Sequence, residues 1–237
     1  MKQLLLLLTA SLLLQLSCKK DTPRKIDSTY KPDVSVSRFT NSTNITHPYF
    51  PATAGKKYIY EGQTEAGAAR IEEQRLSTTK TILGITCITV NFKEYLDGKL
   101  IEEAWDWYAQ DNDGNVWYFG EDVDNYNTDG TLKDHGGSWE AGVDGAQPGT
   151  IMPANPQTGI KYREEYYFNH AEDEAEIIES GLTVTIPLGT YTNCIKTKNW
   201  TDLEPDVTEY KYYAPGVGLV KEENVADKEV ITLIAIQ

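Results

Sequence analysis

Alternation of apolar and polar residues runs through most of the chain from about residue 56 onward, and it restricts the possible folds more than any other feature. Apolar residues occupy every second position over 88–92, and the same spacing recurs over 184–188. A period of two residues is typical of strands with one buried face. No window carries the apolar stripe of an amphipathic helix, so the sequence predicts an all-β domain.

Two other strand-like segments carry an acidic residue on their apolar face. Glu103 shares a face with the apolar residues at 101, 105, 107 and 109. Glu164 interrupts a second apolar face, between Tyr162 and Tyr166. The dipeptides Asp97-Gly98 and Asp129-Gly130 lie between such segments and suit tight hairpins. The segment 229–236 is apolar on both faces, which predicts a central strand that closes the sheet.

Short matches recur at an offset of roughly 105 residues and suggest an internal repeat. The matched segments are 51–58 with 156–162, 86–88 with 193–195, and 107–109 with 212–214. We predict two similar antiparallel meanders in one globular domain over 48–237, forming one sheet-rich or half-barrel-like unit. The halves span about 48–135 and 156–237, and a Gly- and Pro-rich connection covers about 136–158. Turn chemistry shared by antiparallel β proteins is the alternative explanation of the matches.

The first residues form an export signal, predicted over 1–17. Lys2 precedes an apolar run from Leu4 to Leu16, which is shorter than the ~20 residues that a membrane span needs. The tripeptide Leu16-Ser17-Cys18 resembles the lipobox of bacterial lipoproteins. The resemblance implies cleavage before Cys18 and acylation of that residue. Lys19 after the cysteine implies an outer-membrane destination, so the membrane is an expected partner through the lipid anchor.

Residues 18–47 are rich in Ser, Thr, Asn and Pro and show no sustained period, which predicts a lipidated flexible tether. Beyond Cys18, the chain contains only Cys87 and Cys194. An exported protein permits a disulfide between them. Free cysteine packs as a small apolar residue, so we expect two buried thiols, with the disulfide as the alternative.

Four segments resemble a family of secreted bacterial proteins, often lipoproteins, without an established activity. They are VWYFGED at 116–122, GSWEAGVDGAQPG at 137–149, MPANP at 152–156 and YYAPGVGLV at 212–220. The resemblance covers about 50–237. It implies β structure and a location in the bacterial cell envelope, and it supplies no catalytic residue. The last segment also resembles part of the half-barrel lipoprotein carriers.

An acidic loop is the candidate metal site. Asp111, Asp113 and Asn115 place oxygen-bearing side chains at alternate positions, and Asp122 follows eleven residues after Asp111. Such a loop can bind calcium, the one cofactor that the sequence suggests. Val116 stands where an EF-hand requires Gly, so the loop is not an EF-hand. A polar turn capped by its own backbone amides is the alternative.

Aromatic residues are concentrated between 105 and 139. Trp105, Trp107, Trp117 and Trp139 are the candidate ligand-binding residues, because exposed aromatic rings stack on sugars or line apolar pockets. Sheet core is the alternative, since strands are enriched in aromatic residues.

Catalytic motifs are sparse. The three histidines lack metal-ligand spacing, and the chain has neither a nucleophile elbow nor a phosphate-binding glycine loop. The net charge of −14 argues against nucleic-acid binding, which needs a basic surface. We therefore expect non-enzymatic binding or carriage of a small ligand. A calcium-stabilised carbohydrate-binding surface module and a carboxylate-pair hydrolase are the alternatives.

Overall fold

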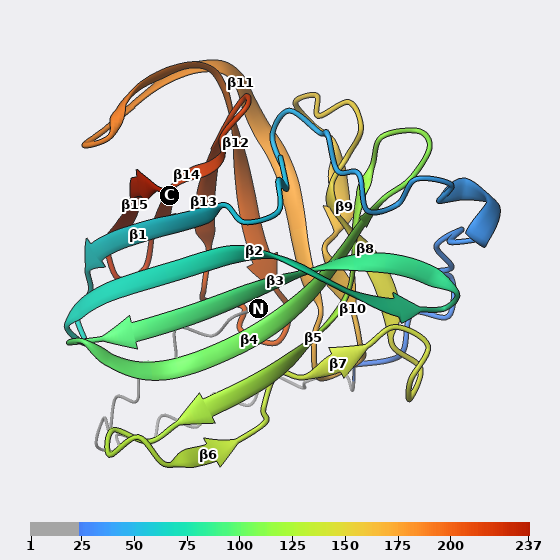
Figure 1. Ribbon diagram of the computed structural model, residues 1–237, viewed down its shortest axis with the longest axis horizontal. Helices are drawn as coiled ribbons and strands as arrows, with labels where there is room; N and C mark the ends of the chain where they lie inside the picture. The colour runs from blue at the N-terminus through green and yellow to red at the C-terminus, as the bar shows by residue number, and fades with distance from the viewer. Residues whose placement is uncertain (1–23) are drawn as a thin grey trace.

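The structure, a computed structural model, describes residues 24–237, so the predicted signal peptide and Cys18 lie outside the described residues. The all-β prediction is confirmed: fifteen strands join in one antiparallel sheet (Figure 1). The single turn of 3-10 helix η1 (Val36–Arg38) is the only helical element of the described chain. Between residues 24 and 237, no helix has the length and apolar content needed to cross a membrane.

The first half of the sheet is a meander of long strands followed by short ones. Its strands are β1 (Lys57–Gln63), β2 (Ala68–Ile82), β3 (Ile85–Leu96), β4 (Lys99–Gln110), β5 (Val116–Tyr126), β6 (Leu132–Asp134), β7 (Trp139–Glu140) and β8 (Gln147–Met152). The second half is β9 (Lys161–Arg163), β10 (Glu165–Tyr166), β11 (Asp173–Ile186), β12 (Gly189–Thr201), β13 (Glu209–Ala214), β14 (Gly218–Asn224) and β15 (Glu229–Ile236).

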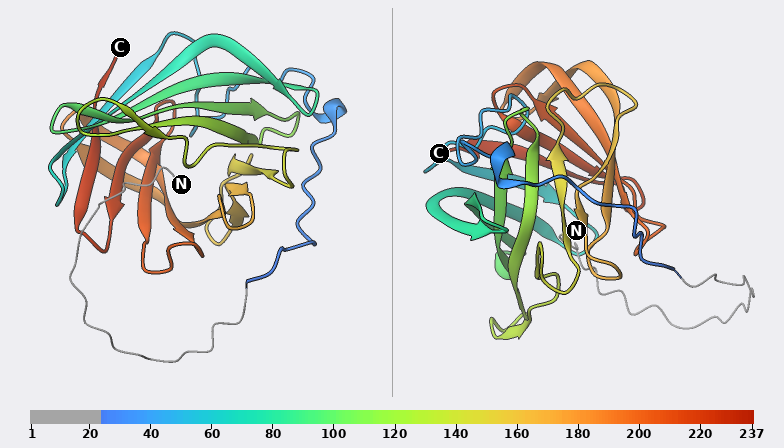
Figure 2. Two further views of the ribbon diagram at one scale, coloured as in Figure 1. Left: turned by 90° about the horizontal axis from the view of Figure 1, so that it is seen from below. Right: turned by 90° about the vertical axis from the view of Figure 1, so that its right-hand side faces the viewer.

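The sheet curves until its two edges are joined by one short stretch of chain (Figure 2). Along the main path of the sheet the order is β10-β8-β5-β4-β3-β2-β1-β15-β14-β13-β12-β11-β9, and β6 and β7 each pair with β5 beside it. The edge strands β9 and β10 are almost continuous in sequence, with Glu164 between them. β9 pairs with β11 and β10 pairs with β8. The stretch 161–166 therefore closes the sheet into a nearly complete barrel, which leaves few unpaired strand edges.

Two local predictions are confirmed by this topology. β15 pairs with both β1 and β14, so the doubly apolar segment 229–236 is the central strand that links the two meanders. Asp97 and Gly98 both have positive φ, at 49° and 76°, as the two-residue turn between β3 and β4 requires.

Close packing at the closure requires a glycine in β8. A Cβ atom placed on Gly149 would lie 2.3 Å from the backbone carbonyl carbon of Glu164, well inside van der Waals contact. β7 and β8 both pair with β5, so the connection predicted over 136–158 contains two short strands. A glycine-rich segment without visible period thus contributes to the sheet, because its pairing depends on β5 and not on its own pattern.

The segment 33–47, here called the arm, lies against the outside of the barrel. Phe39 and Ile45 are buried in the same cluster as β3, β4 and β5, and Phe39 packs edge-to-face on Phe119 at 5.7 Å between ring centroids. The arm backbone also bonds to the barrel, with Gln110 N donating to Ser42 O at 2.8 Å. The flexible tether predicted over 18–47 is therefore wrong for residues 33–47. Isolated apolar residues anchor them without any periodic pattern.

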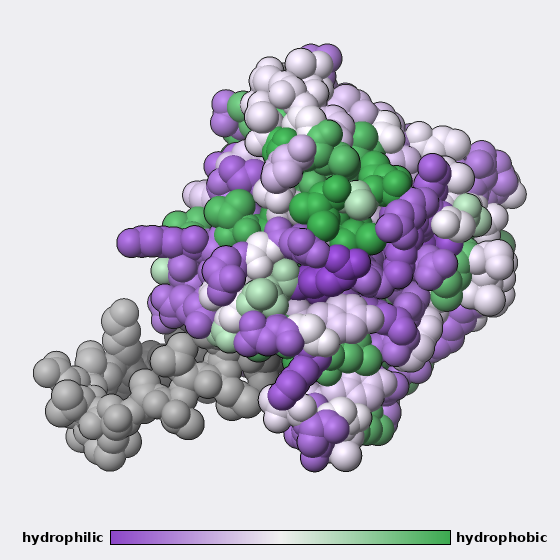
Figure 3. Space-filling view, turned by 60° about the vertical axis from the view of Figure 1, so that its left-hand side comes forward, coloured by the Kyte–Doolittle hydropathy of each residue, from purple (hydrophilic) through white to green (hydrophobic). Residues whose placement is uncertain are grey.

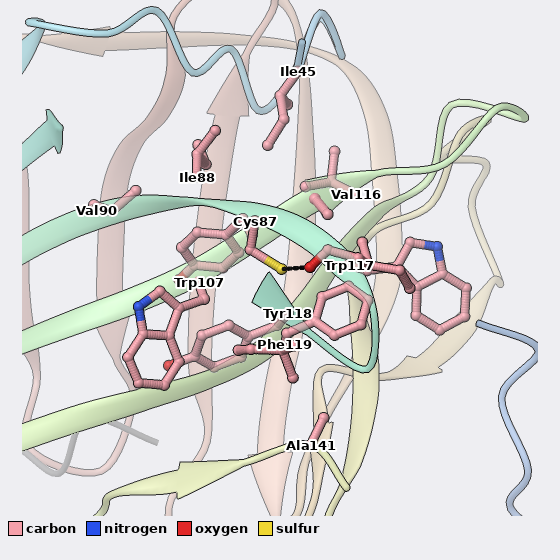
Figure 4. Close-up of a cluster of buried hydrophobic side chains, with 14 of the residues drawn as sticks. Ile45, Cys87, Ile88, Val90, Trp107, Val116, Trp117, Tyr118, Phe119 and Ala141 are labelled. Atoms are coloured by element: carbon pink, nitrogen blue, oxygen red, sulfur yellow. Dashed lines mark hydrogen bonds between the residues drawn. The ribbon is translucent and has the colours of Figure 1, made fainter. Parts of the chain in front are cut away.

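The two cysteines are free and fully buried, as predicted. Cys87 lies on β3 in the cluster shown in Figure 4, where its thiol donates to Ile85 O at 3.7 Å. Cys194 lies on β12 in a second cluster. The matched repeat segments place Cys87 and Cys194, and likewise Tyr108 and Tyr213, at buried positions of the two meanders. The internal repeat itself stays a prediction.

Candidate functional site

The four candidate tryptophans belong to the packed part of the protein. Trp107, Trp117 and Trp139 are buried in the large cluster of Figure 4, and Trp105 is half-buried on β4. Every Trp, Tyr and Phe from residue 24 onward is buried or half-buried. These side chains therefore do not form the exposed flat row on which a sugar ring could stack.

The apolar surface of the barrel is aliphatic instead. Figure 3 shows a group of strongly hydrophobic side chains on one face, surrounded by hydrophilic ones. The exposed large hydrophobic residues in the described chain are all Ile, Val or Leu. None of these most exposed residues carries a ring that could stack on a sugar.

The acidic loop 111–115 is held together by donors to Asp111, whose side chain is 0% exposed. Its Oδ1 accepts from the backbone amides of Asp113 at 3.0 Å and Asn115 at 2.8 Å. Its Oδ2 accepts from the indole of Trp117 at 2.9 Å and from the Asn115 amide at 2.8 Å. Arg38 of the arm reaches the same oxygen at 3.3 Å. Both oxygens of the carboxylate are thus occupied by N–H donors.

The other residues of this loop tie three chain segments together. Asn112 accepts from the Thr40 hydroxyl at 2.7 Å and donates to Ser37 O at 3.0 Å, both in the arm. Asn115 Oδ1 accepts from the backbone amide of Ala154 at 2.8 Å, beyond β8. Asp113 is exposed and pairs with Arg38 at 2.8 Å. Hydrogen bonds from this loop therefore hold the arm and the segment after β8 against the β4–β5 turn.

The structure does not bring Asp122 to this loop. Asp122 is exposed on β5, several residues beyond the turn. Within residues 24–237, no three His, Cys, Asp or Glu side chains are grouped as a metal site requires. The geometry supports the hydrogen-bonded turn, and calcium binding by the loop stays a hypothesis that a melting experiment can test.

A cavity lies inside the barrel, and it is the site that the sequence reasoning missed. Its volume is about 180 Å³, and its lining comes from strands on all sides of the barrel. The apolar and aromatic lining residues are Phe50, Tyr60, Ile71, Phe92, Tyr108, Tyr118, Ile151, Tyr213, Leu219 and Ile231. The polar lining residues are Glu73, Arg75, Glu94, Glu121, Glu164, Glu165, Asp173, Glu209, Lys211, Glu222, Asn224 and Glu229.

Two cations face the many acids of the cavity. Arg75 is buried, pairs with Glu73 at 3.4 Å, and lies over the rings of Phe50 and Tyr58 at 5.2 and 5.4 Å. Lys211 lies between Glu209 at 3.6 Å and Glu222 at 3.7 Å. These neighbouring carboxylates raise the pKa of Lys211 well above its usual value although burial opposes them, so the lysine stays charged.

Glu164 occupies the closure of the barrel and is 5% exposed. Its Oε2 accepts from the amide of Asn199 at 3.0 Å, and its Oε1 is buried without a hydrogen-bond partner among residues 24–237. Burial raises the pKa of Glu164 to about 7, with Lys211 and Asn199 acting in the opposite direction and Asp173 adding to the rise. This carboxyl therefore changes its protonation near neutral pH.

An aromatic wall covers one side of the cavity. Tyr108 and Tyr118 stack with 4.8 Å between ring centroids, and Phe50 packs on Tyr108 at 5.0 Å. The Tyr118 hydroxyl donates to Asp106 at 3.2 Å. Burial raises the pKa values of Tyr108 and Tyr118 well above the usual range, so both phenols stay neutral.

One sequence signal did point to the cavity. Glu164 interrupts the apolar face that contains Tyr162 and Tyr166, and an acid on a buried face usually has a partner or a role. The remaining cavity acids come from strands far apart in the sequence, and their convergence required the barrel.

No protein-family model matches the chain, and no curated protein matches it. Two solved structures resemble it over 80% of this chain and 98% of theirs. One is a candidate exported protein with a YmcC-like fold from Bacteroides fragilis, with a TM-score of 0.46 and 15% identity. The other is a candidate lipoprotein from Parabacteroides distasonis, with a TM-score of 0.42 and 14% identity. The function of this chain therefore has to be inferred from its own residues.

Proposed function

We propose that this protein is a lipoprotein of the bacterial envelope that binds a small ligand inside its barrel without catalysing a reaction. The lipobox-like Leu16-Ser17-Cys18 after an apolar run supports the anchor. Lys19 directs the anchor to the outer membrane, as the lipoprotein resemblance implies. The barrel then stands on the membrane surface and carries its ligand outside the cytoplasm.

The cavity is the observation that carries this proposal. Protein interiors normally pack to the density of organic crystals, so a lined space in a barrel core is exceptional. This one combines aromatic and aliphatic walls with polar groups from opposite strands. Concave sites with a mainly apolar lining and a few convergent polar groups are typical of small-molecule binding.

The hydroxyl, thiol and imidazole nucleophiles of Ser, Thr, Cys and His in the described chain lie outside the cavity lining, which leaves carboxylates and neutral phenols there. Burial raises the pKa of the Cys87 thiol to about 12, which leaves it an unreactive thiol in the core. His47 is buried outside the cavity and its ring contacts Pro153 O at 3.0 Å.

The proposal can be tested with the full-length lipoprotein purified from membranes. Native mass spectrometry should detect a bound small molecule that is released on unfolding. A fragment library should contain compounds that raise the melting temperature of the wild type. Ile71→Trp fills the cavity and should abolish those shifts, because Ile71 lines it.

The matched control is Leu132→Trp, which adds the same ring at a 50% exposed position on β6. This variant should respond to the compounds as the wild type does. The proposal is wrong if no molecule co-purifies and no compound distinguishes the wild type from Ile71→Trp.

A further inference from the structure

We propose that the ligand is a small organic cation, an ammonium group on an apolar body, which the cavity holds through the carboxylate of Glu164. This inference rests on the proposed function, because it names the chemical class of the ligand in the same cavity. It follows from the charge balance of the lining, from a buried acceptor without a donor, and from the aromatic wall.

The charge balance of the lining is strongly negative. Nine carboxyl side chains line the cavity, against Arg75 and Lys211. Arg75 is already paired with Glu73, and Lys211 is shared between Glu209 and Glu222. Neither cation forms an ion pair with Glu164 in the described structure. Burying the Glu164 carboxylate without a counter-charge is costly, and a cationic ligand would remove that cost.

The acceptor without a donor is Glu164 Oε1. The side chain is fixed through its other oxygen by Asn199, so Oε1 is positioned at the cavity wall. A buried acceptor without a donor destabilises the folded state, because its contact with water is lost and nothing replaces it. Glu229 offers a second such oxygen: its Oε1 accepts from the Glu65 amide at 2.7 Å, and its buried Oε2 has no hydrogen-bond partner in the part of the chain that the structure describes. An ammonium group carries the N–H donors that these oxygens lack.

The aromatic wall suits the remainder of such a ligand. Phe50, Tyr108 and Tyr118 present ring surfaces to the cavity, and the phenols stay neutral. Ring faces attract cations within about 6 Å of the centroid, and they also pack against apolar groups. The wall therefore accepts both parts of an amphipathic amine and repels an anion.

Binding of a cation at Glu164 must be coupled to protons. Lys211, Asp173 and Glu165 are the charged groups that face this carboxyl, with Asn199 as its hydrogen-bond donor. Because the pKa of Glu164 lies near 7, the carboxyl is mostly protonated at pH 6 and mostly ionised at pH 8. The affinity for an ammonium group should therefore rise about tenfold from pH 6 to pH 8.

The test uses isothermal titration of the full-length lipoprotein with three probes of similar shape. They are 2-phenylethylamine, which is a cation, 2-phenylethanol, which is neutral, and 3-phenylpropionate, which is an anion. The amine should bind at least tenfold more tightly than the alcohol at pH 8, and the anion should bind most weakly. Glu164→Gln keeps a carbonyl oxygen for Asn199 and should weaken the amine at least tenfold while leaving the alcohol unchanged.

The matched control is Glu179→Gln, which removes the same charge at an exposed position of β11. It should bind all three probes as the wild type does. The cation assignment is overturned if the amine does not bind, if the alcohol or the anion binds as well as the amine, or if Glu164→Gln binds the amine normally. The proposed function is judged separately, by the co-purifying molecule and the Ile71→Trp variant.

Discussion

Replacement of Asp111 by Ala should weaken the protein far more than replacement of its loop neighbour Asp113. Asp111 has a fully buried side chain that receives four hydrogen bonds within the loop and β5, and a contact from Arg38. Asp113 has a side chain that is 72% exposed and pairs with Arg38 at the surface. Comparing the stabilities of the two variants therefore distinguishes the contribution of the loop's buried hydrogen bonds from that of its surface charge.

The size of the effect follows from the donors that lose their acceptor. The Trp117 indole is buried, so leaving it without a partner costs about 1–3 kcal/mol. The two loop amides lie closer to solvent and lose about 1 kcal/mol each. Asp111→Ala should therefore cost about 3–5 kcal/mol, or roughly 10 °C in melting temperature for a chain of this size. Asp113→Ala should cost about 0–1 kcal/mol, because exposed ion pairs contribute little.

Thermal unfolding of the full-length protein by circular dichroism measures both variants, once with chelator and once with millimolar calcium. Calcium should not shift the wild type, because N–H donors occupy both oxygens of Asp111. Equal losses for Asp111→Ala and Asp113→Ala would refute this reasoning. A calcium-dependent rise of several degrees that disappears in Asp111→Ala would show that the loop binds the ion.

Three further predictions concern the anchor, the cavity and the closure of the barrel. Metabolic labelling with a fatty-acid probe should tag the wild type and not Cys18→Ala, and equal labelling of both would exclude Cys18 as the acylated residue. The pKa of Glu164 is about 7 in the folded protein, against 4.5 as its ordinary value. Between these two pH values the folded state retains a proton that the unfolded state has released. The free energy of unfolding should therefore fall as the pH rises from about 4.5 to 7. Glu164→Gln should flatten that fall by up to about 1.4 kcal/mol per pH unit in denaturant titrations, and an unchanged slope would contradict the assignment. Gly149→Ala should destabilise the protein by about 1–3 kcal/mol, because the new Cβ would lie 2.3 Å from the Glu164 backbone. Thr150→Ala is the neighbouring control. Similar stabilities of the two variants would argue against tight packing at the closure of the barrel.

The alternation of apolar and polar residues was sufficient to predict that the chain forms strands, and to predict the place of some strands in the sheet. The doubly apolar segment 229–236 predicted a central strand, and β15 has a partner on each side. The Asp97-Gly98 pair predicted the turn between β3 and β4. Both succeed because backbone conformation and side-chain alternation depend on neighbours only a few residues apart.

Local pattern failed where a segment is ordered by distant partners. Phe39 and Ile45 are isolated apolar residues in a polar stretch, and they are buried only because β3, β4 and β5 present a surface to them. The alternation placed Trp117 on one face of its strand but did not show whether that face would be covered. The arm decides that, through contacts such as the edge-to-face packing of Phe39 on Trp117.

The sequence by itself determined an all-β chain, its alternating faces and the acidic Glu164 on an apolar face, and it predicts an export signal. Only the tertiary structure decided that Glu164 lies at the closure of a barrel, with Lys211 near it and Asn199 bonded to it. These residues lie on three separate segments, and their meeting depends on which strands pair across the sheet. Strand alternation fixes the face to which a side chain points, but long-range pairing and curvature determine which side chains share the interior.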